Sequence, residues 1–280
     1  RLGLITPETV VHCNGGYFRG RLYRCTARHG NQNLEQAVMN SCNTYFFSLM
    51  NRIVLQFGIN DWHAMLQRVG FGRINHIDLP SEGTGILPDS TIMDRFLGRN
   101  RWGLGDQINL GVGQGLVSAS PLQVAVSTAH IANGGYWVQP HIVRAVEHED
   151  GEIDLSTPSK VRIEWIRDRD LEPIRRGMRR AVLEGSGRFY ANPSNVPTAG
   201  KTGTAQNPRG RDHGWFVGYA PYDDPKIVVA VIIENGGFGS VSAAPIASLL
   251  MEQYITGEIK RPRLVQDMLN FVPRSSDVAR

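Results

Sequence analysis

The most informative stretch of this 280-residue chain is Ala199-Gly200-Lys201-Thr202-Gly203-Thr204-Ala205. Lysine is rare in the chain, since it occurs only at positions 160, 201, 226 and 260. A chain of this composition would contain a Lys-Thr-Gly triplet by chance roughly one time in fifty. A phosphate-binding loop is disfavoured, because such a loop needs a glycine where Asn195 stands and a helix directly after the lysine. The triplet therefore indicates another kind of site.

A strand that lines an acyl-transfer site fits this stretch better. Gly203 has no side chain, so a substrate backbone can approach the strand closely. Lys201 places a cation in the cleft, and the hydroxyls of Thr202 and Thr204 can donate to a substrate carboxylate. Such a site also needs a proton relay and a nucleophile.

The surrounding sequence predicts helices packed on an antiparallel sheet. Two short β-branched or aromatic runs, Trp215–Tyr219 and Ile227–Ile233, indicate an antiparallel strand pair. Apolar spacing and capping residues predict helices at 33–57 (one helix ended by Gly58, or two with a break near Ser41), 61–69, 121–132, 170–183 and 243–254. The arginine-rich side of 170–183 indicates solvated surface, and the tail after Pro262 is expected to be poorly ordered. The predicted fold class is α+β.

Composition limits the classes of function. Hydrophobic residues make up 41% of the chain, as a buried core requires, and a formal charge of +4, evenly spread, does not indicate a nucleic-acid partner. No apolar run reaches the roughly 18–20 residues that span a bilayer. The chain opens with Arg1 and has no signal-peptide layout, so we expect it to be a piece of a longer protein.

Ser41-Cys42-Asn43 is the candidate proton relay. A Ser-x-Asn triplet alone carries no weight, because this composition yields on the order of one by chance. Its order and context give it weight. It lies in an amphipathic helical region well before Lys-Thr-Gly, and the two motifs flank the glycine-rich segment 111–115.

Taken in order, these motifs resemble the transpeptidase domain of class B penicillin-binding proteins, and within that class the elongation-type penicillin-binding protein 2. The resemblance implies a penicillin-binding, serine β-lactamase-like α+β fold, with an antiparallel sheet flanked by helices and the N-terminal part of the domain missing. We expect a partial transpeptidase domain at 1–262 and a C-terminal tail at 263–280. The matching segments are Ser41-Cys42-Asn43, Gly113-Gln114-Gly115, 120–125, 131–135, 199–204 and 215–221.

The resemblance also implies a reaction and roles for the matching residues. Family members attack the D-Ala-D-Ala amide of a peptidoglycan stem peptide with a serine and pass the acyl group to an amine on a neighbouring stem. Ser41 would relay a proton, Asn43 would hold the substrate amide, and Lys201 would polarise the relay. Thr202 and Thr204, beside Gly203, would bind the substrate carboxylate, and the Thr204 N–H would form half of an oxyanion hole.

The nucleophile of the family is absent from this chain. It is the serine of a Ser-x-x-Lys turn, but Thr157, Thr198, Asp223 and Gly257 stand three residues before the four lysines. Because that turn precedes Ser-x-Asn in the family, we expect it upstream of Arg1. The resemblance further implies β-lactam binding, a polytopic glycosyltransferase partner, and a site on the periplasmic face of the inner membrane, held by an N-terminal helix that this chain lacks.

All three cysteines lie close together in the sequence, at Cys13, Cys25 and Cys42. Two interpretations stay open. A disulfide between Cys13 and Cys25, across a hairpin at residues 14–16, suits an extracytoplasmic protein. A structural zinc site would instead use all three thiolates with His29, and some penicillin-binding protein 2 homologues hold a metal beside the Ser-x-Asn loop with Asp, Asp, His and Cys. His12 is expected to be a spectator.

Two other functions share some of these motifs. A serine β-lactamase or D,D-carboxypeptidase also carries Ser-x-Asn and Lys-Thr-Gly, but the Gly-Gln-Gly to Pro-Leu-Gln stretch at 113–123 is typical of transpeptidases. A non-catalytic sensor or scaffold would keep the cleft and lack the serine. Only sequence upstream of this chain separates that interpretation from the enzyme.

Overall fold

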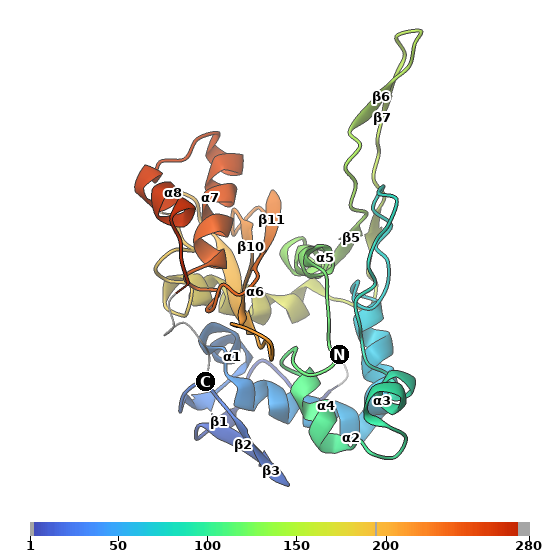
Figure 1. The fold of residues 1–280 in the computed structure, drawn as a ribbon, viewed down its shortest axis with the longest axis vertical. Coiled ribbons are helices and arrows are strands. Elements are labelled where there is room, and N and C mark those ends of the chain that lie inside the picture. Colours follow the sequence, from blue (N-terminus) through green and yellow to red (C-terminus); the bar gives the residue numbers. More distant parts are fainter. Residues whose placement is uncertain (1–2, 194, 274–280) are drawn as a thin grey trace.

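A computed structural model of the chain, which describes residues 3–193 and 195–273, contains helices and antiparallel sheets, as the α+β prediction requires (Figure 1). The helices are α1 (Leu34–Asn40), α2 (Asn43–Gln67), α3 (Ser90–Leu97), α4 (Leu104–Leu110), α5 (Pro121–Ala132), α6 (Asp168–Leu183), α7 (Ala243–Thr256) and α8 (Pro262–Leu269). The strands are β1 (Val11–Cys13), β2 (Gly16–Arg19), β3 (Arg21–Arg24), β4 (Gly30–Gln32), β5 (Tyr136–Val138), β6 (Ala145–Glu147), β7 (Ile153–Leu155), β8 (Lys160–Arg162), β9 (Ala199–Ala205), β10 (His213–Ala220) and β11 (Ile227–Ile233). None of the described helices is both long enough and apolar enough to cross a bilayer.

The central sheet has the strand order β11-β10-β9, and all its pairs are antiparallel. The two faces of β10 alternate with period two. Phe216 packs in a cluster with residues of α7, whereas Tyr219 packs on the other face with residues of α1, α5 and α6. Helices thus cover both faces. Within the described residues β9 and β11 are the two outer strands of this sheet, and β9 carries the Lys-Thr-Gly triplet along its free edge.

Of the two alternatives for residues 33–57, the structure has two helices with a break near Ser41. Helix α1 begins with a capping box between Asn33 and Gln36 and ends at Ser41, whose φ of 53° and ψ of 47° are left-handed. Helix α2 starts two residues later and runs past the predicted end at Gly58. Gly58 nevertheless has a non-helical φ of 82° and ψ of 173°. The predicted helix end at Gly58 is therefore a kink between two helical segments.

The other helix predictions are confirmed at the level of existence, and the expectation of a poorly ordered tail is wrong for residues 262–269. The helix at 121–132 has the predicted bounds, with Ser120 as its N-cap and proline in its first turn. The tail after Pro262 is not uniformly irregular, since α8 forms there and buries Leu264. Helix α8 was not predicted because it is short and buries only one side chain. Residues 274–280 of the predicted tail lie outside the described residues.

Several short elements carried too weak a sequence pattern to be predicted. Strands β5 to β8 have three residues each, and β6 and β7 form an exposed hairpin that projects from the body (Figure 1). The hairpin near the cysteines turns at Gly20, between β2 and β3, and not at residues 14–16. A period-two or period-3.6 pattern needs more residues than these elements have.

The arginine-rich side of α6 is not simply solvated. Arg176 and Arg180 both form ion pairs with Glu35 of α1, at 3.0 and 3.1 Å. Arg176 remains exposed, as predicted, whereas Arg180 is partly buried in this contact. The ion pairs connect α6 with the helix that leads into Ser41.

In the turn after β11, we predict that the fold does not tolerate a side chain at Gly239. A Cβ atom there would lie 2.0 Å from the Trp215 oxygen and 2.4 Å from the Gly203 oxygen, so the turn rests on the main chain of β10 and β9. We expect Gly239→Ala to lower the free energy of unfolding by about 1–3 kcal/mol, as overpacking does. Urea denaturation measures it. Gly83→Ala is the matched control, because a Cβ there meets nothing within 4 Å. Equal losses in both variants would contradict the prediction.

Candidate active site

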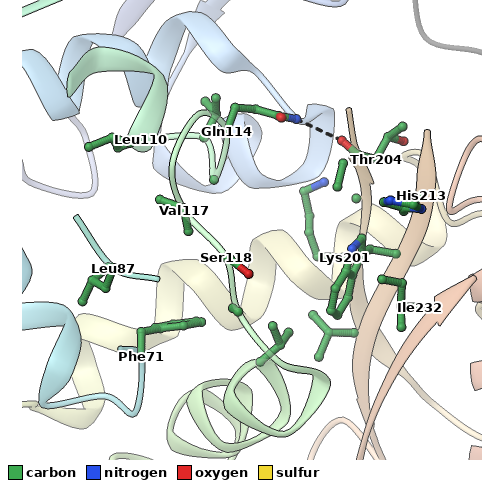
Figure 2. Close-up of a pocket in the computed structure, with 18 of the residues that line it drawn as sticks. Phe71, Leu87, Leu110, Gln114, Val117, Ser118, Lys201, Thr204, His213 and Ile232 are labelled. Atoms are coloured by element: carbon green, nitrogen blue, oxygen red, sulfur yellow. Dashed lines mark hydrogen bonds between the residues drawn. The ribbon is translucent and has the colours of Figure 1, made fainter. Parts of the chain in front are cut away.

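The free edge of β9 faces a cavity of about 520 Å³. Figure 2 shows its two walls. Lys201 and Thr204 of β9 lie on one side, and Leu110 at the end of α4, with Gln114 and Val117 of the segment after it, lies on the other. Deeper in the cavity the lining is apolar and includes Phe71 and Leu87. A polar edge beside an apolar interior is the usual composition of a small-molecule or peptide site.

The structure brings the predicted relay serine and the predicted lysine together. The ammonium group of Lys201 donates a hydrogen bond to Ser41 Oγ, although 160 residues separate the two in sequence. It also donates to the main-chain oxygen of Thr202 at 2.7 Å. Desolvation lowers the pKa of Lys201 to about 8. An amine with a pKa near neutrality can hold or release a proton at physiological pH, which suits a relay.

Ser41 reaches Lys201 because of the joint between α1 and α2. Its left-handed backbone ends α1, and the N–H of Cys42 bonds the Ala37 carbonyl at 2.9 Å, as in a Schellman motif. A non-glycine residue with left-handed φ and ψ lowers the stability of the fold by an amount of order 1–3 kcal/mol, and such residues tend to occur at functional sites. Three successive residues of the joint thus receive different surroundings: Ser41 contacts Lys201, Cys42 is buried, and Asn43 begins α2.

Asn43 is the predicted site residue with the weakest link to the cleft. Its side-chain amide donates to the main-chain oxygen of Arg24 at 3.5 Å, and it is not among the residues that line the cavity. The three residues after Lys201 do line it. Gly203 lies tightly against its neighbour strand, since a Cβ there would come within 3.1 Å of Trp215 Cβ.

Two residues of this region were not assigned a role from sequence. Ser186, in the Gly-Ser-Gly turn after α6, shares a hydrogen bond with the Thr202 hydroxyl. Gln114 donates from its side-chain amide to the Thr204 main-chain oxygen at 3.1 Å, across the cavity (Figure 2). A Gly-Ser-Gly turn is too common to be a signal, whereas the glycines on both sides of Gln114 marked a special backbone.

The four predicted metal ligands also converge. The sulfur atoms of Cys13, Cys25 and Cys42 and a ring nitrogen of His29 all lie within 4.8 Å of one another. His29 Nδ1 is 3.6 Å from Cys13 Sγ and 3.5 Å from Cys25 Sγ. A tetrahedron with Zn–S bonds of about 2.3 Å and Zn–N bonds of about 2.05 Å has S–N edges of about 3.6 Å. The residues present therefore fit a closed zinc site.

The chemistry of the cluster agrees with that fit. All three cysteines are free thiols. The pKa of the Cys25 thiol is lowered, chiefly by a hydrogen bond from the Cys42 thiol, and the same contact raises the pKa of Cys42. The contact thus favours a thiolate at the place where a metal ion would bind one. His12 lies outside the cluster and bonds Asn31 Oδ1 at 2.8 Å.

Comparison with known proteins places this geometry in a family. The family described as penicillin binding protein transpeptidase domain matches residues 1–252. The peptidoglycan D,D-transpeptidase MrdA of Acinetobacter baumannii is 34% identical over 282 residues, which cover 92% of this chain and 39% of the relative. The chain spans about two fifths of the length of the curated relatives it matches.

Solved structures agree with that match. Pseudomonas aeruginosa PBP2 in complex with WCK 5153 has a TM-score of 0.75 at 32% identity, covering 93% of this chain and 57% of that chain. A chain from a peptidoglycan synthase complex, solved to show how polymerization and crosslinking are coordinated, has a TM-score of 0.78 at 31% identity, covering 92% and 44%. The chain therefore belongs to the penicillin-binding protein transpeptidase domain family, with the fold of that family, and resembles its penicillin-binding protein 2 members.

Proposed function

We propose that this chain is the relay and substrate-binding part of a peptidoglycan D,D-transpeptidase of cell-wall elongation. The observation that carries the proposal is the contact of Lys201 with Ser41 beside the free edge of β9. In this reaction a serine oxygen attacks the carbonyl carbon between the two D-alanines of a stem peptide. The C–N bond breaks, D-alanine leaves with a proton, and the acyl group passes to an amine of a second stem.

The described residues supply the proton path and the anion contacts. Ser41, polarised by Lys201, passes the proton to the leaving amine. The hydroxyls of Thr202 and Thr204 donate to the terminal carboxylate of the donor peptide, and Asn43 orients its amide. The Thr204 N–H stabilises the oxyanion of the tetrahedral intermediate, where loss of one donor typically costs about 3–4 kcal/mol of barrier. β-Lactams, which are also acyl donors, use the same contacts.

The nucleophile of this reaction comes from residues outside this chain, because the chain contains no Ser-x-x-Lys. The apolar inner wall of the cavity, with Phe71, Leu87 and Leu110, suits the packing of a helical segment that presents such a serine to Ser41. We place that segment upstream of the chain, as the order of motifs in the family implies.

Penicillin labelling tests the assignment of the nucleophile. We expect a polypeptide of residues 1–280 to show no covalent adduct with a fluorescent penicillin by intact-mass analysis, because it contains no Ser-x-x-Lys nucleophile. We expect the product of the whole gene to form one adduct per molecule. A stoichiometric adduct on residues 1–280 contradicts the first expectation. No adduct on the whole product supports a non-catalytic sensor or scaffold, and rapid nitrocefin turnover supports a β-lactamase.

We further propose that Cys13, Cys25, His29 and Cys42 hold one structural zinc ion. The distances within the cluster and the number of thiolates support this assignment over a disulfide between Cys13 and Cys25. When bound, zinc would supply a fixed cross-link between β1, the segment after β3 and the joint before α2. Because Cys42 lies between Ser41 and Asn43, its thiolate would fix the backbone of both relay residues.

The remaining parts of the proposal follow the relatives. The synthase complex named above pairs polymerization with crosslinking, which supports a polytopic glycosyltransferase as the partner of this protein. With such a partner and a stem-peptide substrate, the proposed location of the domain is the periplasmic face of the inner membrane, with an N-terminal helix outside this chain as its anchor. Co-purification of the membrane-anchored whole gene product with the glycosyltransferase tests the partner.

A further inference from the structure

Gln114 occupies a main-chain acceptor at the sheet edge with which an extended peptide would pair. Its side-chain amide donates to the Thr204 oxygen at 3.1 Å, and 90 residues separate the two in sequence (Figure 2). Gln114 is half-buried and stands on the loop between α4 and α5, whereas Thr204 stands on β9. The hydrogen bond therefore runs across the cavity from one wall to the other.

The Thr204 oxygen faces the free edge of the sheet. In an antiparallel pair, alternate residues turn their main-chain groups toward the partner strand and the residues between turn them away. Thr202 and Thr204 are two residues apart, and both carbonyls accept side-chain hydrogen bonds, from Lys201 and from Gln114. Their main-chain groups therefore point away from β10 and into the cavity.

A peptide that pairs with this edge competes directly with Gln114. Strand addition to a sheet edge uses main-chain hydrogen bonds, and two directly opposed residues of a hydrogen-bonded pair exchange both N–H···O bonds. If the Thr204 N–H bonds the reacting carbonyl oxygen, the N–H of that same substrate residue must donate to the Thr204 oxygen. Gln114 already fills that position with an amide N–H of its own.

The loop that carries Gln114 is built to place this side chain. Gly113 and Gly115 have φ angles of +73° and +80°, which non-glycine residues rarely adopt. No atom lies within 4 Å of a Cβ at Gly113, and only one, at 3.5 Å, near a Cβ at Gly115. The two glycines are therefore needed for backbone conformation and not for lack of space, and the loop between them holds Gln114 over the strand edge.

We propose that Gln114 is a gating residue that acts as an internal substitute for the substrate amide. Gln114 blocks the Thr204 oxygen before the peptide binds. When an acyl-D-Ala-D-Ala peptide binds, its own N–H replaces the Gln114 N–H as the donor to that oxygen. This inference rests on the proposed function for the identity of the peptide. Removal of the Gln114 donor should strengthen the binding of any ligand that supplies the missing N–H.

A thermodynamic cycle of two ligands and three proteins tests this inference. The ligands are diacetyl-L-Lys-D-Ala-D-Ala and an analogue with D-lactate in place of the first D-alanine, so that an ester oxygen replaces the N–H that pairs with Thr204. The proteins are residues 1–280 in wild-type form, the near-isosteric Gln114→Met, and Gln139→Met as the matched control. Gln139 also donates a side-chain N–H to a main-chain oxygen, that of His76 at 3.0 Å, far along the chain from the site. NMR titration measures each dissociation constant without turnover.

We expect Gln114→Met to bind the peptide more tightly by roughly 2- to 12-fold, the factor that one net hydrogen bond provides. We expect no gain for the ester analogue, which cannot use the vacated acceptor, and no change in Gln139→Met. If Gln114→Met changes the dissociation constants of both ligands equally, or changes neither, the gating role is wrong. Binding of the peptide would still support the proposed function. Absence of peptide binding by all three proteins contradicts the proposed function, and the gate falls with it. Gln114→Ala repeats the comparison if Gln114→Met fails to fold.

Discussion

Loss of the proposed zinc ion is expected to unfold the region around the relay and to lower the stability of the whole chain. Closed zinc sites contribute apparent binding free energies of about 10–16 kcal/mol in small zinc-dependent peptides, so removal should cost several kcal/mol here. We expect about one zinc ion per chain by elemental analysis, and a lower melting temperature after chelation. Amide hydrogen exchange should rise at residues 40–45, because Cys42 connects the cluster to Ser41 and Asn43.

Substitutions at Cys25 sharpen the zinc prediction. Cys25 is only half-buried, so Cys25→Ser removes a ligand with little change in packing, and it should reduce both zinc content and stability. Cys25→Asp keeps a ligand atom and should restore part of both. His12→Ala is the control, because His12 lies outside the cluster. A Cys13–Cys25 disulfide found by mass spectrometry, in protein without zinc, would contradict the site.

Lys201 is expected to give the chain a pH-dependent stability that no exposed lysine provides. Burial lowers its pKa from the ordinary 10.5 to about 8. Below about pH 8 both the folded and the unfolded chain are protonated, so the penalty for burying the cation is constant. Between about pH 8 and 10.5 the unfolded chain keeps a proton that the folded chain has released. The free energy of unfolding therefore rises with pH across this window, by up to about 3 kcal/mol at 1.36 kcal/mol for each pKa unit.

Lys201→Met is expected to remove this rise. Urea denaturation at several pH values between 7 and 10.5 measures the free energy of unfolding of wild type and variant. Subtracting one profile from the other removes the contribution of the cysteines and tyrosines, which titrate in the same range in both proteins. Lys226→Met is the matched control, because Lys226 is exposed and should leave the profile unchanged. If Lys201→Met and wild type show parallel profiles, Lys201 is not desolvated, and its proposed role in the relay loses its electrostatic basis.

Local interactions explain which elements could be predicted from sequence. The caps at Asn33 and Ser120 involve residues three positions apart, so they are visible in the sequence itself. The β-branched and aromatic runs of β10 and β11 are local in the same sense. The short elements could not be predicted from sequence, because three-residue strands and the eight-residue α8 contain too few positions to show a pattern.

The sequence by itself determined the α+β class, the Lys-Thr-Gly strand, the four candidate metal ligands and the absence of Ser-x-x-Lys, and it left a break near Ser41 as one of two alternatives. Only the tertiary structure decided which of these residues meet. It brought Lys201 to Ser41, gathered His29 with the three cysteines, and set Gln114 on the Thr204 oxygen. Sequence spacing specifies neighbours only within a turn or a strand pair. Contacts over 90 or 160 residues depend on how the helices pack on both faces of one sheet, and on which strand remains at its edge.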